Sequence, residues 1–140
     1  MAKAKVTIGR LEYIALPKLG VARVQAKIDT GAYRSALHYQ KITLRNVDDH
    51  EELVVTFAMG RKRTKMVFKR FRRVVVKTST GQRTERYLIT TSVKLNRHTV
   101  PTQFSLFDRS DMKHQVLLGR KFLNSRFVVD VARKNVLDAR

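Results

Sequence analysis

The chain has 140 residues, of which 43% are hydrophobic, enough for one domain with its own core. Its 30 Lys and Arg outnumber its 11 Asp and Glu, which gives a formal net charge of +19. This composition argues against disorder, against a membrane-spanning helix and, without cysteine, against disulfide or thiolate chemistry. The basic N-terminus lacks the apolar segment of a secretory signal. We therefore expect residues 1–140 to form one cytoplasmic domain with no membrane partner.

The basic residues are concentrated in one part of the chain. Residues 61–97 hold thirteen of them and a single acidic residue, Glu85. A field this positive attracts polyanions and speeds their association. The partner could be nucleic acid, an anionic lipid surface or an acidic polypeptide, and the alternative is that the charge serves only solubility.

Alternating and β-branched segments predict strands along the chain, and we find no long amphipathic helix. The first strand begins near Val21 and ends at the Asp29 loop. The others are predicted at residues 53–59, 74–76, 86–93, 100–106 and 127–129. Turn signals at 46–49, 60–61, 80–81 and 96 separate these segments, and one short helix is predicted at 120–124. The pattern is typical of an all-β sandwich or barrel built from hairpins.

One predicted hairpin is strongly basic. Residues 73–79 lead into it and 83–93 lead out, with Gly81 able to take a positive φ at the tip. The segment 69–86 holds seven basic residues, Lys69, Arg70, Arg72, Arg73, Lys77, Arg83 and Arg86. Such a hairpin is either a solvated edge that discourages aggregation or a lid over an acidic ligand.

Two short motifs point to a specific fold. Asp29-Thr30-Gly31-Ala32 follows an apolar strand, and Leu117-Leu118-Gly119 opens the predicted helix about ninety residues later. With the hairpin between them, the order resembles the half-barrel of retropepsins, the closed all-β fold with a flap-like hairpin and one short helix after the glycine. Segments 8–12, 15–17, 29–38, 108–112, 117–120 and 127–130 also resemble a family of bacterial and archaeal proteins labelled ATP-dependent zinc proteases and linked with ATP-grasp glutamate ligases. Arg34 and residues 79–81 depart from that family's pattern.

The resemblance implies aspartic peptidase chemistry centred on Asp29. Such an enzyme needs two carboxylates that share one proton, so that one activates water while the other polarises the scissile carbonyl. Gly31 lets backbone N–H groups approach the carboxylate, and the Thr30 hydroxyl can bond into the facing half of the site. One Asp-Thr-Gly supplies one carboxylate, which implies a C2 homodimer. The alternative is a second carboxylate from the same chain, for which the candidates are Asp108, Asp111 and Asp130.

The sequence does not support the zinc and ATP parts of the family label. The histidines are His38, His50, His98 and His114, and no two have the i, i+4 spacing of a helical zinc motif. Segment 50–54 begins like such a motif but ends in Val54, and no phosphate-binding loop is present. We expect no metal and no cofactor, although a site that joins His38 to Asp29 stays open. We interpret 108–111 as a turn capped by its own Asp side chains.

The favoured function is a peptidase that acts on acidic, glutamate-rich peptides or tails. The expected substrate-binding residues are Ala32, Arg34, Arg73, Lys77, Ser79, Gly81, Arg83 and Arg86. The alternative is a non-catalytic β-barrel that binds nucleic acid through residues 61–97, since basic and aromatic residues alternate at 68–73. A third reading is an inactive dimerisation module.

Overall fold

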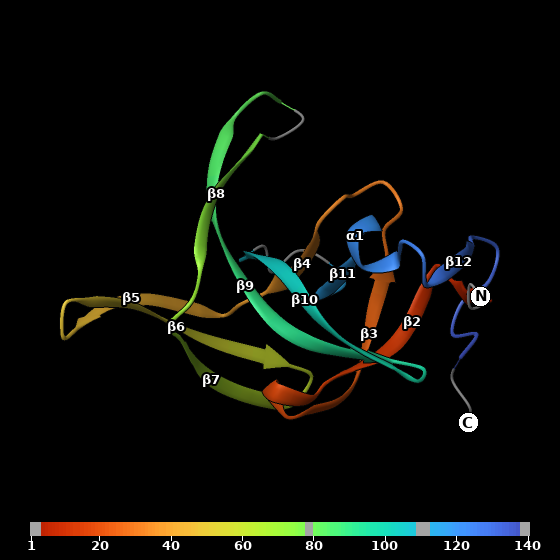
Figure 1. Ribbon diagram of the computed structural model, residues 1–140, viewed down its shortest axis with the longest axis horizontal. Coiled ribbons are helices and arrows are strands. Elements are labelled where there is room, and N and C mark those ends of the chain that lie inside the picture. Colours follow the sequence, from red (N-terminus) through yellow and green to blue (C-terminus); the bar gives the residue numbers. More distant parts are fainter. Residues whose placement is uncertain (1–3, 78–79, 109–112, 138–140) are drawn as a thin grey trace.

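Six strands close into a barrel in the order β10-β4-β11-β3-β2-β9, with β9 pairing back to β10 (Figure 1). The computed structural model describes residues 4–77, 80–108 and 113–137. The barrel strands are β2 (Leu11–Leu16), β3 (Val21–Ile28), β4 (Ser35–His38), β9 (Arg83–Leu95), β10 (His98–Phe107) and β11 (Val116–Leu118). The predicted all-β retropepsin-like barrel is therefore confirmed.

Further elements surround the barrel. β8 (Arg72–Lys77) pairs with the start of β9 to form the predicted hairpin, which rises above the barrel in Figure 1. β5 (Lys41–Val47), β6 (His50–Met59) and β7 (Lys62–Phe68) form a separate three-stranded sheet. β1 (Val6–Gly9) pairs in parallel with β12 (Phe127–Asp130). The helical elements are η1 (Pro17–Leu19) and α1 (Arg120–Leu123).

All of the predicted strands lie within observed ones, and α1 ends one residue earlier than predicted. The predicted turns are also present: Asp48, Asp49, Asn96 and Gly81 have φ values of 50°, 64°, 58° and 87°. β1, β2, β4, β5, β7 and β11 were not predicted. The alternation in β5 is short, because it covers only residues 41–45 before the predicted turn.

One hydrophobic core joins the barrel to the three-stranded sheet. Leu53, Val55 and Phe57 on β6 belong to the same buried cluster as the barrel residues Leu37 and Phe104. Alternation along β6 places these side chains on one face, so the other face of the sheet points away from the core. Within the described residues, no helix is long and apolar enough to span a membrane.

A buried carboxylate ties the two ends of the described chain together. Glu12 on β2 is 0% exposed, and its oxygens accept from the Gly9 amide at 2.7 Å and from the Val136 and Leu137 amides at 2.9 and 3.1 Å. A Cβ on Gly9 would lie 2.5 Å from the Arg133 carbonyl oxygen, so only glycine fits there. The motif at 8–12 therefore has a structural role in holding the C-terminal segment against the barrel.

Candidate active site

The candidate carboxylate lies where β3 leaves the barrel. The Asp29 amide donates to the Leu118 carbonyl at 2.8 Å, so the backbone stays extended through Asp29 before the loop turns. The Gly31 amide donates to Asp29 Oδ1 at 3.1 Å, which orients the carboxylate. Asp29 is half-buried, whereas Thr30 and Gly31 are exposed.

Strand β11 passes between the two strands that the Asp29 loop connects. It runs parallel to β3 and antiparallel to β4, so the end of β11 lies under the loop. The amides of Arg120 and Lys121 donate to the carbonyls of Ala32 and Tyr33 at 2.8 and 2.9 Å. The Arg120 guanidinium adds a bond to the Thr30 carbonyl at 3.0 Å. Three hydrogen bonds from the segment after Gly119 thus hold the Asp29 loop in place.

Gly119 is required at this crossing because the backbone of the loop lies against it. A Cβ there would be 2.6 Å from the Arg34 carbonyl oxygen and 2.7 Å from that of Tyr33. The Gly119 amide donates to the hydroxyl of the buried Ser35 at 3.1 Å. The sequence motifs identified Gly119, but they did not single out Ser35 or Arg120 as supports of the loop. The sequence signal for the role of Arg120 is its position directly after Gly119.

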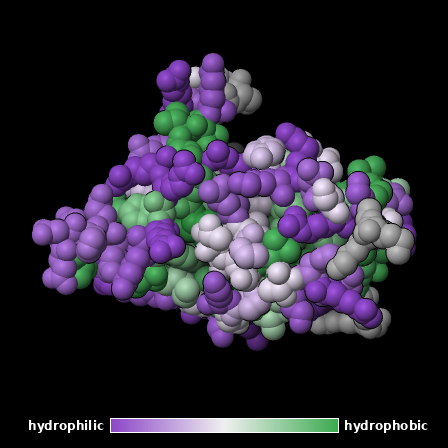
Figure 2. All heavy atoms as spheres, in the orientation of Figure 1, coloured by the Kyte–Doolittle hydropathy of each residue, from purple (hydrophilic) through white to green (hydrophobic). Residues whose placement is uncertain are grey.

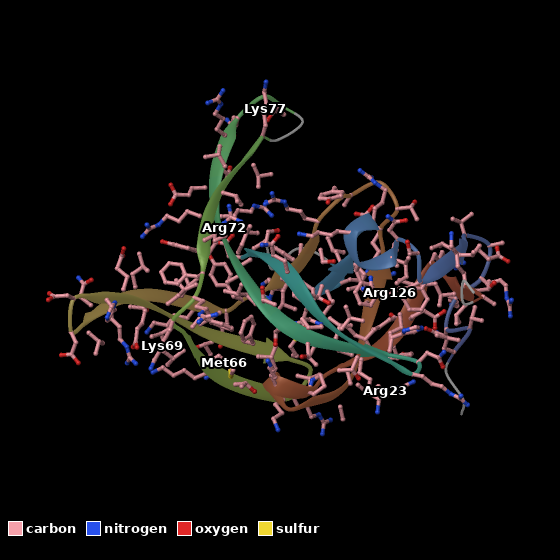
Figure 3. The ribbon with its side chains drawn as sticks, viewed as in Figure 1. Arg23, Met66, Lys69, Arg72, Lys77 and Arg126 are labelled. Atoms are coloured by element: carbon pink, nitrogen blue, oxygen red, sulfur yellow. The ribbon has the colours of Figure 1, made fainter. Side chains whose placement is uncertain are left out.

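The structure places the expected substrate-binding residues in two regions. Ala32 and Arg34 lie in the Asp29 loop, and the basic residues of β8 and β9 lie on the hairpin. Figure 3 shows Lys77 near the end of the hairpin and Arg72 near its base. Lys77 and Arg83 face each other across the two strands. Ser79 lies outside the described residues, and Gly81 is exposed at the tip.

Two of these arginines have neighbours within the chain. Arg73 pairs with Glu51 at 3.2 Å and Glu85 at 3.5 Å, and its guanidinium lies 5.6 Å from the Tyr87 ring centre. Burial raises the pKa of Tyr39, and the charges of Asp108 and Tyr87 raise it further, whereas the nearby charge of Arg86 lowers it. Lys77 and Arg83, which are both exposed, pair with each other near the end of the hairpin.

Of the same-chain candidates for the second carboxylate, Asp108 lies away from Asp29. Phe107 pairs with His38 at one end of β4, whereas Gly119 and the Asp29 loop lie at the Ser35 end. Asp108 is thus about 10 Å or more along the strand from the loop, at roughly 3.4 Å per residue. Asp130 accepts from the Ala132 amide at 3.0 Å and caps a turn. Asp111 lies outside the described residues.

The donor set of the described residues does not fit a zinc site. No group of three or more His, Asp or Glu side chains comes together in the described ranges. The His38 ring packs on Phe107 with centres 5.5 Å apart, and the His98 ring packs on Phe127 at 5.4 Å. These histidines are part of aromatic contacts, and His38 lies at the far end of β4 from Asp29.

Comparison with known proteins agrees with this geometry. Residues 7–140 match the RimB-like family, described as retropepsin-like aspartic endopeptidase RimB. A crystal structure of a Legionella pneumophila protein of unknown function superposes with a TM-score of 0.77 over 95% of this chain and 98% of that one. At 22% identity, this similarity supports the fold alone.

Curated relatives are longer proteins. A probable alpha-L-glutamate ligase of Shewanella halifaxensis is 29% identical over 136 residues, which is 93% of this chain and 29% of that protein. The corresponding protein of Desulfotalea psychrophila is 30% identical over 133 residues, or 92% of this chain and 29% of its own length. The chain spans under a third of these relatives. Because the family match covers nearly all of its residues, the chain belongs to the RimB-like family of retropepsin-like aspartic endopeptidases.

Proposed function

We propose that this protein is an aspartic peptidase in which Asp29 is the catalytic carboxylate. The observation that carries the proposal is the fixed Asp29 loop, whose carboxylate accepts the Gly31 amide while residues 118–121 hold the backbone on both sides. An immobile carboxylate at the surface of a barrel can hold a water molecule without reorganising during the reaction. The family assignment supports the same general chemistry.

The second carboxylate would come from Asp29 of another copy in a C2 homodimer. Thr30 and Gly31 are exposed, and Tyr33 beside them is 56% exposed. Next to the loop lies an open hollow of about 630 Å³, lined in part by Thr30, Tyr33 and Phe127. Figure 2 shows apolar side chains at the edge of the molecule that carries β12, where Val128 is 50% exposed. Exposed apolar groups of this kind are suited to an interface.

In such a dimer the two carboxylates share one proton. The charged carboxylate removes a proton from water as the water oxygen bonds to the scissile carbonyl carbon, and the protonated one gives its proton to the carbonyl oxygen. When the intermediate collapses, the C–N bond breaks and the amide nitrogen takes the proton that the dyad removed from water. One hydroxyl of the tetrahedral intermediate returns its proton to the other carboxylate as the C=O bond forms again, so the dyad ends with one shared proton and can act again.

An acidic, glutamate-rich segment is the substrate that we propose. The net charge of +19 and the Lys77–Arg83 pair on the hairpin support it, because both would attract carboxylates. The hydrophilic end of the hairpin is visible in Figure 2. The names of the longer relatives, probable alpha-L-glutamate ligases, also suit a substrate made of linked glutamates.

The test is cleavage of a glutamate-tailed peptide by the wild type and by Asp29→Asn, with sedimentation to measure the dimer. We expect the substitution to lower kcat by about 100-fold or more, because it removes the acid–base pair. Asp48→Asn is the matched control, since it makes the same change at a distant turn where φ is 50°. Equal cleavage by the wild type and Asp29→Asn would refute the proposal.

A second candidate function, binding of nucleic acid without catalysis, is favoured by one feature. The outward face of the β5–β6–β7 sheet has two adjoining hollows, of about 690 and 230 Å³, and both are lined by Lys41, Thr56 and Lys65. Salt-sensitive binding of a single-stranded oligonucleotide, lost in Lys65→Gln and kept in Asp29→Asn, would support this function. Failure to bind at low salt would exclude it.

A further inference from the structure

A lysine precedes the candidate catalytic carboxylate by two residues on the same strand face. Ala26 and Ile28 on β3 are buried in the barrel, whereas Lys27 is exposed. Because the backbone remains extended through Asp29, alternation places Lys27 and Asp29 on the outward side. Their Cα atoms are then roughly 6.5 Å apart along the strand.

The neighbouring strands continue this surface. Lys27 pairs with Leu117 on β11, and Leu117 pairs with Ala36 on β4. Leu117 and Ala36 are half-buried, while the residues on either side of each point into the core. The three side chains form a strip across the outside of the barrel, with a cation at one end and two apolar side chains beside it. We call this strip the Lys27 floor.

A second lysine lies near the Lys27 floor. Burial is the main cause that lowers the pKa of His114, and the charges of Lys113 and Lys27 lower it further, so these groups lie within electrostatic range of one another. Among the described residues, no carboxylate forms an ion pair with Lys27. Its charge is therefore available to an anion that reaches the floor beside Asp29.

We propose that Lys27 is a specificity-determining residue that binds the carboxylate of a substrate side chain next to the scissile bond. This inference rests on the proposed peptidase function and names the subsite that would bind an acidic side chain of the substrate. In an extended peptide, alternate side chains point to the same side, so one flanking side chain faces the floor. Leu117 and Ala36 contact its methylene groups, and the Lys27 ammonium pairs with its carboxylate.

Lys27 and the hairpin differ in what each contributes. The exposed hairpin charges would act mainly by long-range attraction, which salt weakens, whereas Lys27 would act by direct contact with the substrate carboxylate. Lys27 is fixed on a barrel strand beside the reacting carbonyl, so it selects which peptide bond is cleaved. A charged hydrogen bond of this kind discriminates by about 10- to 100-fold between a carboxylate and its uncharged amide.

The experiment compares two peptides that differ only in Glu or Gln beside the scissile bond. kcat/KM is measured at high salt, about 0.5 M, where the Debye length is short and the hairpin's contribution is screened. We expect the wild type to prefer Glu by about 10- to 100-fold and Lys27→Met to lose that preference while still cleaving the Gln peptide. Lys94→Met is the control, because Lys94 is another exposed lysine on a barrel strand and lies outside the site.

A binding measurement separates failure of this inference from failure of the peptidase proposal. In the Asp29→Asn background, the Glu peptide should bind more tightly than the Gln peptide, and adding Lys27→Met should abolish the difference. If no variant cleaves either peptide, the peptidase proposal fails and this binding ratio still decides the role of Lys27. An unchanged Glu preference in Lys27→Met, by cleavage or by binding, overturns the inference, as does the absence of any preference in the wild type.

Discussion

Replacing Glu12 by alanine should destabilise the protein more than any single surface change. The Glu12 carboxylate is fully buried and accepts three backbone N–H groups, from Gly9, Val136 and Leu137. Alanine leaves all three without their acceptor. The Gly9 bond is buried and the other two are partly buried, so water can partly replace only the latter.

The magnitude follows from these three bonds. A buried donor that loses its partner costs about 1–3 kcal/mol, and hydrogen bonds to charged groups lie at the upper end of that range. With full cost at one amide and partial cost at two, Glu12→Ala should lower the unfolding free energy by about 3–5 kcal/mol. Glu12→Gln keeps one carbonyl oxygen as an acceptor, so its loss should be about half as large.

Urea unfolding, followed by circular dichroism or by tyrosine fluorescence, measures the effect. With an m value of about 2 kcal/mol per molar, the midpoint of Glu12→Ala should fall by roughly 2 M. Glu51→Ala is the control, because Glu51 is exposed and its pair with Arg73 should contribute about 1 kcal/mol or less. A loss below about 1 kcal/mol for Glu12→Ala would refute the assignment of a structural role to this carboxylate.

Two further substitutions test the residues that support the Asp29 loop, and a third tests the titration of His114. Gly119→Ala puts a Cβ within 2.7 Å of two loop carbonyls, so it should cost about 1–3 kcal/mol and reduce any peptidase activity by displacing the loop, as thermal unfolding and cleavage assays would show. Ser35→Ala removes the acceptor of the Gly119 amide and should cost about 1–2 kcal/mol in the same unfolding assay; no loss would mean that water replaces the hydroxyl. The pKa of His114 is lowered in the folded state, so below its ordinary value of 6.5 the unfolded chain binds more protons. The stability that comes from neutral His114 is thus fully present above pH 6.5 and is lost as the pH falls toward the lowered pKa. Urea titrations at several pH values should find this loss reduced in His114→Gln.

The sequence predicted the elements whose side chains alternate strongly or whose turns need special residues. Residues 86–93 and 100–106 alternate clearly, and they lie within the two strands that form the longest pairing of the barrel. Asp48, Asn96 and Gly81 were identified as turn residues, and each has a positive φ. These features are local, because alternation and backbone conformation depend on near neighbours in the chain.

The candidate site was predicted in part. The Asp-Thr-Gly motif and Gly119 were recognised from a resemblance, and the structure brings the two segments into contact through the amides of Arg120 and Lys121. The roles of Ser35 and Lys27 were not predicted. Ser35 supports the loop only because β11 passes beneath it, and Lys27 has a neighbouring strip only because of its register with Leu117.

The sequence by itself thus determined an all-β fold, an unusually basic chain and one candidate carboxylate. Tertiary structure decided which residues surround that carboxylate, that Arg73 is paired with Glu51 and Glu85, and that Glu12 is a buried acceptor for the C-terminal segment. The physical reason is that these interactions join residues far apart in the chain. Strand order and register set them, and no local pattern encodes which distant strand will pair with which.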